Sequence, residues 1–198
     1  MSEMENALKE LLIYNDKNSE QTAKALIGRF GSFHRIAQNE YGAISELSSE
    51  KDAVMIKLLA ALASRNVTDL FKFGREHTEE EWEKYLCALF FDASDETVYF
   101  FPVDSKGRVL SCELIGEGTV NTSEFNPRKI IEVLVKRKAS RGIIAHNHPA
   151  GVAEPSEEDF MATKLIRDVM KAVEKELVYH YIVAGDRVCG IDPSQLSD

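Results

Sequence analysis

The chain has 198 residues, and the 44% that are hydrophobic are enough to bury a core, which argues against a disordered chain. Its net charge of −9 argues against nonspecific binding to nucleic acid, because that affinity comes from clustered lysine and arginine side chains. No apolar run reaches the roughly 20 residues of a membrane-spanning helix, and the acidic start MSEMENALKE lacks the pattern of a secretory signal. The three cysteines are too isolated to form a disulfide framework. We therefore expect a cytoplasmic protein of one or two domains that has no membrane partner.

Residues 1–76 are predicted to form a small all-α module. Apolar side chains recur there at helical spacing in four segments, and serines stand before some of them as candidate N-caps. The apolar positions are Leu8, Leu11 and Leu12, then Ala23, Leu26, Ile27 and Phe30, then Phe33 and Ile36, and finally Val54, Met55, Leu58, Leu59 and Leu62. No strand pattern occurs in this part of the sequence.

Residues 77–198 are predicted to form a second domain, in which helices and strands are mixed. Its first helix begins at the capping box 78–81, because a threonine followed by a glutamate three positions later satisfies two free amides. Aromatic and β-branched residues then predict strands at 96–103 and 109–115, joined by a turn. Pro102 lies inside the first of these strands and indicates an edge position or a bulge.

The remaining elements are predicted in the order helix, strand, helix, strand. Asn126 followed by Pro127 is typical of an N-cap and a first helical position. The expected elements are a helix from there to about 138, a strand at 142–145, a long helix that opens at Ser156, and a last strand at 178–183.

Two histidines directly follow the predicted strand 142–145. Only one residue separates His146 from His148, so both side chains point to the same face. Asp159 falls in the first turn of the helix that Ser156 opens, where the helix dipole favours a carboxylate. Two imidazoles and a carboxylate are a common ligand set for catalytic zinc, which leaves one position for water and lowers the pKa of that water to about 7. This spacing indicates a Zn²⁺ site at His146, His148 and Asp159.

Other interpretations of the same residues stay open at this point. Ser156 with Asp159 also makes an ordinary N-cap with a first-turn acid, and a histidine at a strand end is usually a hydrogen-bonded polar residue. The letters His146-Asn147-His148 also suggest an HNH nuclease. That interpretation is weak, because such nucleases spread their three key residues through a finger instead of placing them consecutively.

The motif itself resembles a known family. His146-x-His148-Pro149, followed six residues later by Ser156-x-x-Asp159, is similar to the JAMM signature of JAB/MPN metalloproteases, and HNHPAGVAEPSEED is similar to the corresponding stretch of the bacterial RadC family. The segment 127–131 (PRKII) resembles the P-R-E-V-V of that family, and the likeness runs from about residue 80 to 185. The resemblance implies a mixed α/β fold, in which helices flank the cytidine-deaminase-like sheet of JAB/MPN domains.

The resemblance also implies roles for individual residues. It identifies Glu96 as the general base, which the residues alone do not select from Glu113, Glu117 and Glu132. It gives Ser156 a hydrogen bond to the developing oxyanion. The implied activity is a zinc-dependent peptidase or isopeptidase acting on a protein or peptide substrate.

Two departures from the family pattern bear on an alternative function. The family has Asp-His where this chain has His180-Tyr181, and we interpret His180 as a surface histidine in preference to a polar neighbour of the site. The helical module resembles a helix-hairpin-helix region but has Ser48-Ser49-Glu50-Lys51 in place of hairpin glycines, which argues against a nucleic-acid partner. The alternative is a non-enzymatic RadC-family module that serves DNA repair or protein interaction.

Overall fold

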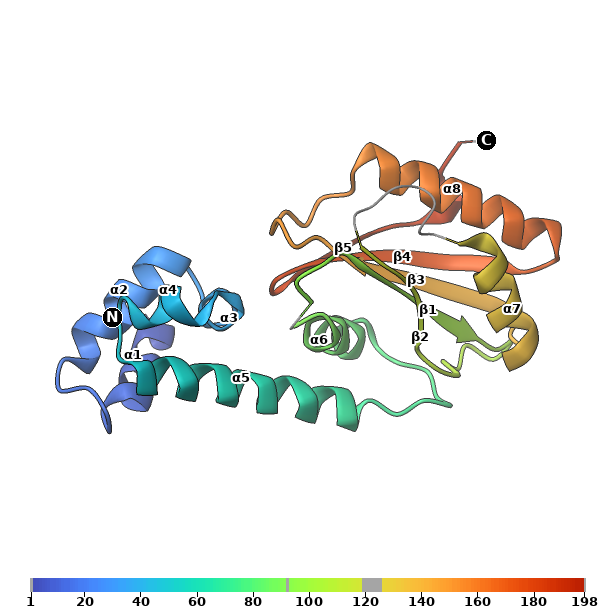
Figure 1. The fold of residues 1–198 in the computed structure, drawn as a ribbon. Helices are drawn as coiled ribbons and strands as arrows, with labels where there is room; N and C mark the ends of the chain where they lie inside the picture. The colour runs from blue at the N-terminus through green and yellow to red at the C-terminus, as the bar shows by residue number, and fades with distance from the viewer. Residues whose placement is uncertain (1, 92, 119–125, 198) are drawn as a thin grey trace. The chain divides into compact units, whose positions relative to one another are not determined.

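The structure, a computed structural model, describes residues 2–91, 93–118 and 126–197 (Figure 1). The chain divides into two compact units, Met1–Asn66 and Val67–Asp198. No helix in the described ranges has the length and apolar character needed to cross a membrane.

The first unit is entirely helical, as the sequence predicts. Its helices are α1 (Glu3–Leu12), α2 (Ser19–Phe30), α3 (Phe33–Gln38), α4 (Tyr41–Ser45) and the start of α5 (Glu50–Leu70). Their apolar stripes supply the buried side chains Leu8, Leu12, Ala23, Leu26, Ile36, Ile44 and Ile56. Helix α4 was not predicted, because a five-residue helix with one buried side chain is too short to show a helical period.

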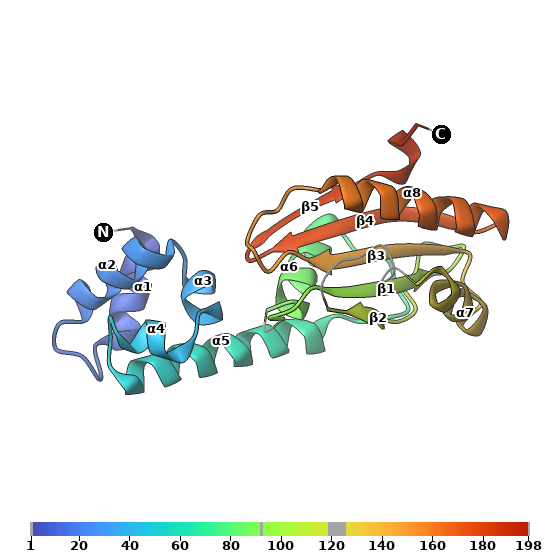
Figure 2. The same ribbon diagram turned by 45° about the horizontal axis from the view of Figure 1, so that its top comes forward.

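The second unit contains a five-stranded sheet with the order β2-β1-β3-β4-β5. The strands are β1 (Thr97–Val103), β2 (Glu113–Glu117), β3 (Arg141–Asn147), β4 (Glu176–Ala184) and β5 (Arg187–Ile191), and only the β3–β4 pair among them is parallel. Helix α6 (Glu79–Leu89) covers one face, whereas α7 (Pro127–Arg137) and α8 (Glu157–Ala172) cover the other (Figures 1 and 2). The predicted mixed sheet flanked by helices is therefore confirmed.

Alternating strand residues build a separate core on each face of this sheet. On the face of α7 and α8, Phe100 and Ile144 pack with Ile166 of α8. On the face of α6, Phe101 and Ile143 pack with aromatic side chains of that helix. The two histidines of the motif belong to the α7 and α8 face, since His146 has the same parity as Ile144.

The second unit begins before the sequence-based division at residue 77. Phe71 is buried, and its ring stacks on Tyr85 of α6 with 3.9 Å between the ring centroids. Trp82 lies 5.4 Å from the same ring. This aromatic cluster ties the segment before α6 to the sheet domain.

Three strand predictions differ from the structure. The second strand begins at Glu113 instead of Val109, which forms only an isolated bridge with Val103. The predicted edge position of Pro102 is wrong, because β1 lies between β2 and β3. The sheet tolerates the missing N–H of Pro102 because this residue lies beyond the last β1–β2 pair. Strand β5 was not predicted, since RVCGI is short, contains glycine and has only Ile191 fully buried.

The packing of Gly142 makes a first prediction. A methyl group there would lie 2.2 Å from Cζ of the buried Phe100, so Gly142→Ala is expected to lower the free energy of unfolding by about 1–3 kcal/mol. Urea titration followed by circular dichroism measures the change. Gly28→Ala in α2 is the control, because nothing surrounds that position within 4 Å and the change is expected to stabilise its helix. Equal stability of Gly142→Ala and wild type would contradict this packing.

Candidate metal centre

The site lies where the inner strand β3 ends. His146 is the penultimate residue of β3, and His148 follows the strand directly. Strand β1 runs antiparallel to β3 and pairs Val98 with His146, so the start of β1 lies beside the end of β3. Glu96 precedes β1 by one residue and shares the parity of Val98, which places it on the same face as His146.

Four side chains converge at this point: the three predicted ligands His146, His148 and Asp159, and Glu96, which the resemblance implies as general base. The two histidine Nε2 atoms are 2.9 Å apart. Asp159 lies 3.0 Å from His146 Nε2 through Oδ1 and 3.3 Å from His148 Nε2 through Oδ2. Glu96 Oε1 is 3.6 Å from His146 Nε2. No other histidine, cysteine or carboxylate joins the group among the residues that the structure describes.

The tautomer of His148 is set by the loop that follows it. Its Nδ1 lies 2.9 Å from the carbonyl oxygen of Val152. Because a carbonyl only accepts hydrogen bonds, Nδ1 carries the hydrogen, and the Nε2 of a neutral imidazole then points its lone pair at His146 and Asp159.

Asp159 closes the group from the first turn of α8. Its Oδ2 accepts hydrogen bonds from the backbone N–H of Ser156 at 2.8 Å and from the Ser156 hydroxyl at 2.7 Å, which completes a capping box. Its Oδ1 is buried and accepts no hydrogen bond. A buried carboxylate oxygen without a donor is costly unless a cation meets it.

The pKa shifts within the group indicate the same preference for a cation. Burial raises the pKa of Asp159, but the neighbouring imidazoles outweigh burial and hold that pKa well below its usual range. Asp159 in turn raises the pKa of His148, whereas burial lowers the pKa of His146. The arrangement therefore stabilises a cation between these side chains, and a metal ion fits the donor set.

Asn147 holds the segment that carries Glu96. Its Oδ1 accepts a hydrogen bond from the backbone N–H of Thr97 at 2.7 Å, and its Nδ2 donates to the carbonyl of Asp95 at 3.1 Å. The residues on both sides of Glu96 are thus fixed to β3.

The glutamates that compete with Glu96 have other contacts. Glu113 accepts hydrogen bonds from Arg137 at 2.9 Å and from Ser111 at 2.8 Å. Glu132 pairs with Arg128 at 3.0 Å on an exposed helix face. Among the glutamates that the structure describes, Glu96 alone joins the histidine group.

His180 is not the surface histidine that we expected. Its exposed fraction is 0%, and its Nε2 lies 2.8 Å from His146 Nδ1. Strand β4 is an inner strand, and α8 covers the face to which His180 points. The signal was present in the sequence, because His180 alternates in phase with Ile182 and Ala184, both of which are buried.

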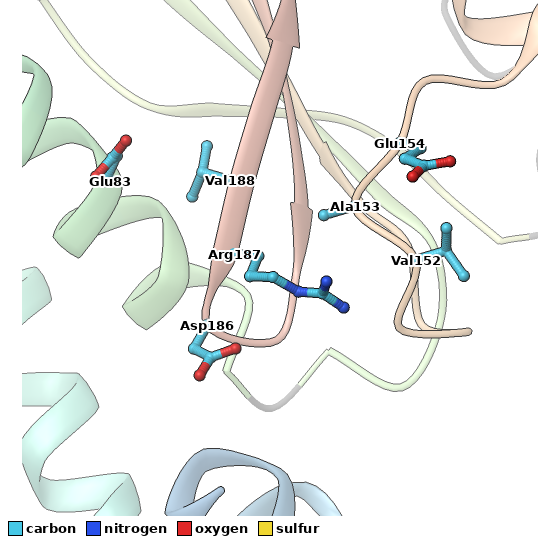
Figure 3. A pocket seen from close by; sticks show the side chains of 7 residues that line it. All are labelled: Glu83, Val152, Ala153, Glu154, Asp186, Arg187 and Val188. Carbon is cyan, nitrogen blue, oxygen red and sulfur yellow. The ribbon is translucent and has the colours of Figure 1, made fainter. Parts of the chain in front are cut away.

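A pocket of about 390 Å³ lies beside the loop that follows His148 (Figure 3). Its wall comes from α6, from the loop after β3 and from the β4–β5 hairpin, through Glu83, Val152, Ala153, Glu154, Asp186, Arg187 and Val188. The loop connects pocket and site, since the Val152 carbonyl holds His148 and the Gly151 carbonyl accepts a hydrogen bond from Arg187 at 3.2 Å.

Comparison with known proteins identifies the family. The profile described as the RadC-like JAB domain matches residues 77–195. The chain belongs to the RadC family. A UPF0758 protein of Aliivibrio fischeri (strain MJ11) is 28% identical over 177 residues, which cover 86% of this chain and 78% of the relative. A UPF0758 protein of Vibrio cholerae serotype O1 (strain M66-2) is 30% identical over 169 residues, covering 84% and 75%.

The RadC-like match includes every residue of the site, from Glu96 to His180. The family and the JAB fold that the motif implied are therefore confirmed. The helical unit lies outside the matched range, but the two relatives cover most of the chain.

The hydrogen bonds from Asn147 to the segment 95–97 lead to a second prediction. Asn147→Ala removes the acceptor of a buried N–H, so we expect it to lower the free energy of unfolding by about 1–3 kcal/mol. Ser140→Ala is the matched control, because the buried Ser140 hydroxyl has no hydrogen-bond partner and its loss is expected to cost little. Urea titration measures the free energy of unfolding of both variants. Equal losses would contradict a stabilising role for the hydrogen bonds of Asn147.

Proposed function

We propose that this protein is a zinc-dependent hydrolase of peptide or isopeptide bonds. The observation that carries the proposal is the convergence of two imidazole Nε2 atoms and a buried, donor-free carboxylate oxygen on one point. Membership of the RadC-like JAB family supports it, because the matched range contains these residues and their sequence resembles the JAMM signature.

Zinc suits this donor set better than other common metals. Tetrahedral zinc with bonds of about 2.0–2.1 Å places its ligand atoms roughly 3.3 Å apart. The two histidine Nε2 atoms are 2.9 Å apart, and Asp159 Oδ1 lies 3.0 Å from His146 Nε2, so these separations are close to that spacing. Two nitrogens and one oxygen favour zinc over magnesium or calcium, which prefer oxygen ligands only. A zinc ion bound there supplies a Lewis acid and a water of lowered pKa.

The protein groups divide the chemistry between them. Glu96 Oε1 takes the proton from the attacking water and later gives it to the leaving amine nitrogen, so that water and amide become acid and amine. Its Oε1 lies 3.6 Å from His146 Nε2, which places it next to the ligands. The Ser156 hydroxyl donates to Asp159 and steadies that ligand, so the oxyanion role requires the hydroxyl to turn toward the substrate.

Metal content provides a third prediction. Elemental analysis is expected to find about one zinc per chain in purified wild type. It is expected to find no zinc in the double variant His146→Ala/His148→Ala. Cys189→Ser is the control, because it removes a thiol from β5 but leaves the ligand set intact. A metal-free wild type after growth and dialysis in zinc would leave the non-enzymatic interaction module as the better account.

The role of Glu96 provides a fourth prediction. Glu96→Gln keeps the size of the side chain but cannot accept a proton, so hydrolysis is expected to fall about 10²–10⁴-fold while zinc stays bound. The assay is a panel of peptide- and isopeptide-linked substrates, scored by amine release. Glu113→Gln is the matched control, since Glu113 lies outside the metal group and is expected to leave hydrolysis unchanged. Equal loss in both variants would exclude Glu96 as the base.

A further inference from the structure

Two buried polar side chains contact the ligand set without belonging to it. His180 and Thr163 both have an exposed fraction of 0%. His180 Nε2 lies 2.8 Å from His146 Nδ1, and His180 Nδ1 lies 2.6 Å from Thr163 Oγ1. Thr163 Oγ1 is also 2.6 Å from the carbonyl oxygen of Asp159, one turn earlier in α8.

The direction of each hydrogen bond in this series follows from its last acceptor, the carbonyl oxygen of Asp159. The Asp159 carbonyl only accepts, so the single hydroxyl hydrogen of Thr163 is donated to it. Thr163 Oγ1 then accepts from His180, which therefore carries its hydrogen on Nδ1. A fully buried imidazole stays neutral because a buried charge is costly, so the Nε2 of His180 has only a lone pair. That lone pair accepts the hydrogen of His146 Nδ1.

The order of these hydrogen bonds decides which nitrogen of His146 carries the hydrogen. With its hydrogen on Nδ1, His146 presents the lone pair of Nε2 toward His148 and Asp159. The reverse order would place a hydrogen on Nε2 and close the site to a cation. We propose that His180 and Thr163 are positioning residues that hold His146 in the tautomer whose Nε2 binds the metal. The inference rests on the proposed metal site and deepens it.

The two ligand histidines thus carry their hydrogen on the same nitrogen, Nδ1, but they donate it to different acceptors. A loop carbonyl accepts from Nδ1 of His148. His146 lies inside the sheet between β1 and β4, where backbone carbonyls are engaged in strand pairing. A side chain must therefore provide the acceptor, and Thr163 is needed because an imidazole alone can either donate or accept.

The test uses the matched pair Thr163→Val and Thr163→Ser in the full chain. Valine has the shape of threonine without its hydroxyl, so His180 is expected to move its hydrogen to Nε2 and to reverse the order at His146. Nitrogen NMR of ¹⁵N-histidine-labelled, metal-free protein is expected to show His146 with its hydrogen on Nδ1 in wild type and Thr163→Ser. In Thr163→Val a population with the hydrogen on Nε2 is expected. Zinc affinity, measured by competition with a chromogenic chelator, is expected to fall about 10–100-fold in Thr163→Val only.

A second pair of variants keeps the test decisive if Thr163→Val fails to fold. His180→Gln retains an acceptor for His146, whereas His180→Leu does not, so only the leucine variant is expected to lose zinc affinity. Ile182→Val is the control for packing, since Ile182 is equally buried on the same face of β4.

The outcomes separate this inference from the proposed function. Unchanged His146 tautomer and zinc affinity in folded Thr163→Val, or equal affinity of His180→Gln and His180→Leu, would overturn the roles of these two residues. A wild type that binds no zinc would overturn the proposed function, and the NMR of the metal-free protein would still decide the order of the hydrogen bonds.

Discussion

The site depends on the parallel pairing of β3 with β4. Parallel neighbours need a crossover connection, and α8 provides it, so the chain leaves the end of β3, crosses the sheet face and returns at the start of β4. The crossover brings the first turn of α8 back over the end of β3. Asp159 consequently meets His146 and His148, although no regular element links these residues locally. The same pairing places His180 of β4 beside His146.

The second requirement is the electrostatic balance of a nearly dry site. His146 is fully buried, and the exposed fraction of Asp159 is only 1%. The helix dipole and the capping box stabilise the carboxylate at one oxygen, but they leave the other without a donor. A divalent cation would meet this oxygen and the Nε2 atoms of His146 and His148 at once.

The sequence predicted the parts of this site that follow from local geometry. Alternation along a strand placed His146 and His148 on one face, and capping rules placed Asp159 in a first helical turn. Glu96 was different, because its position depends on the antiparallel pairing of β1 with β3 over a distance of many residues. Only the family resemblance selected it. His180 was misjudged because a histidine in a strand was weighed by its polarity, while the burial of Ile182 and Ala184 in the same phase was not used.

The two interpretations of Asp159 that the sequence left open turn out to concern different oxygen atoms. Oδ2 accepts from the backbone and hydroxyl of Ser156, which is the N-cap interpretation. Oδ1 is buried without a donor and faces the Nε2 of His146, which is the ligand interpretation. The cap is therefore the device that holds the ligand, because it fixes the carboxylate rotamer before any ion arrives. A site oriented in this way by its own fold loses little conformational entropy when it binds a metal.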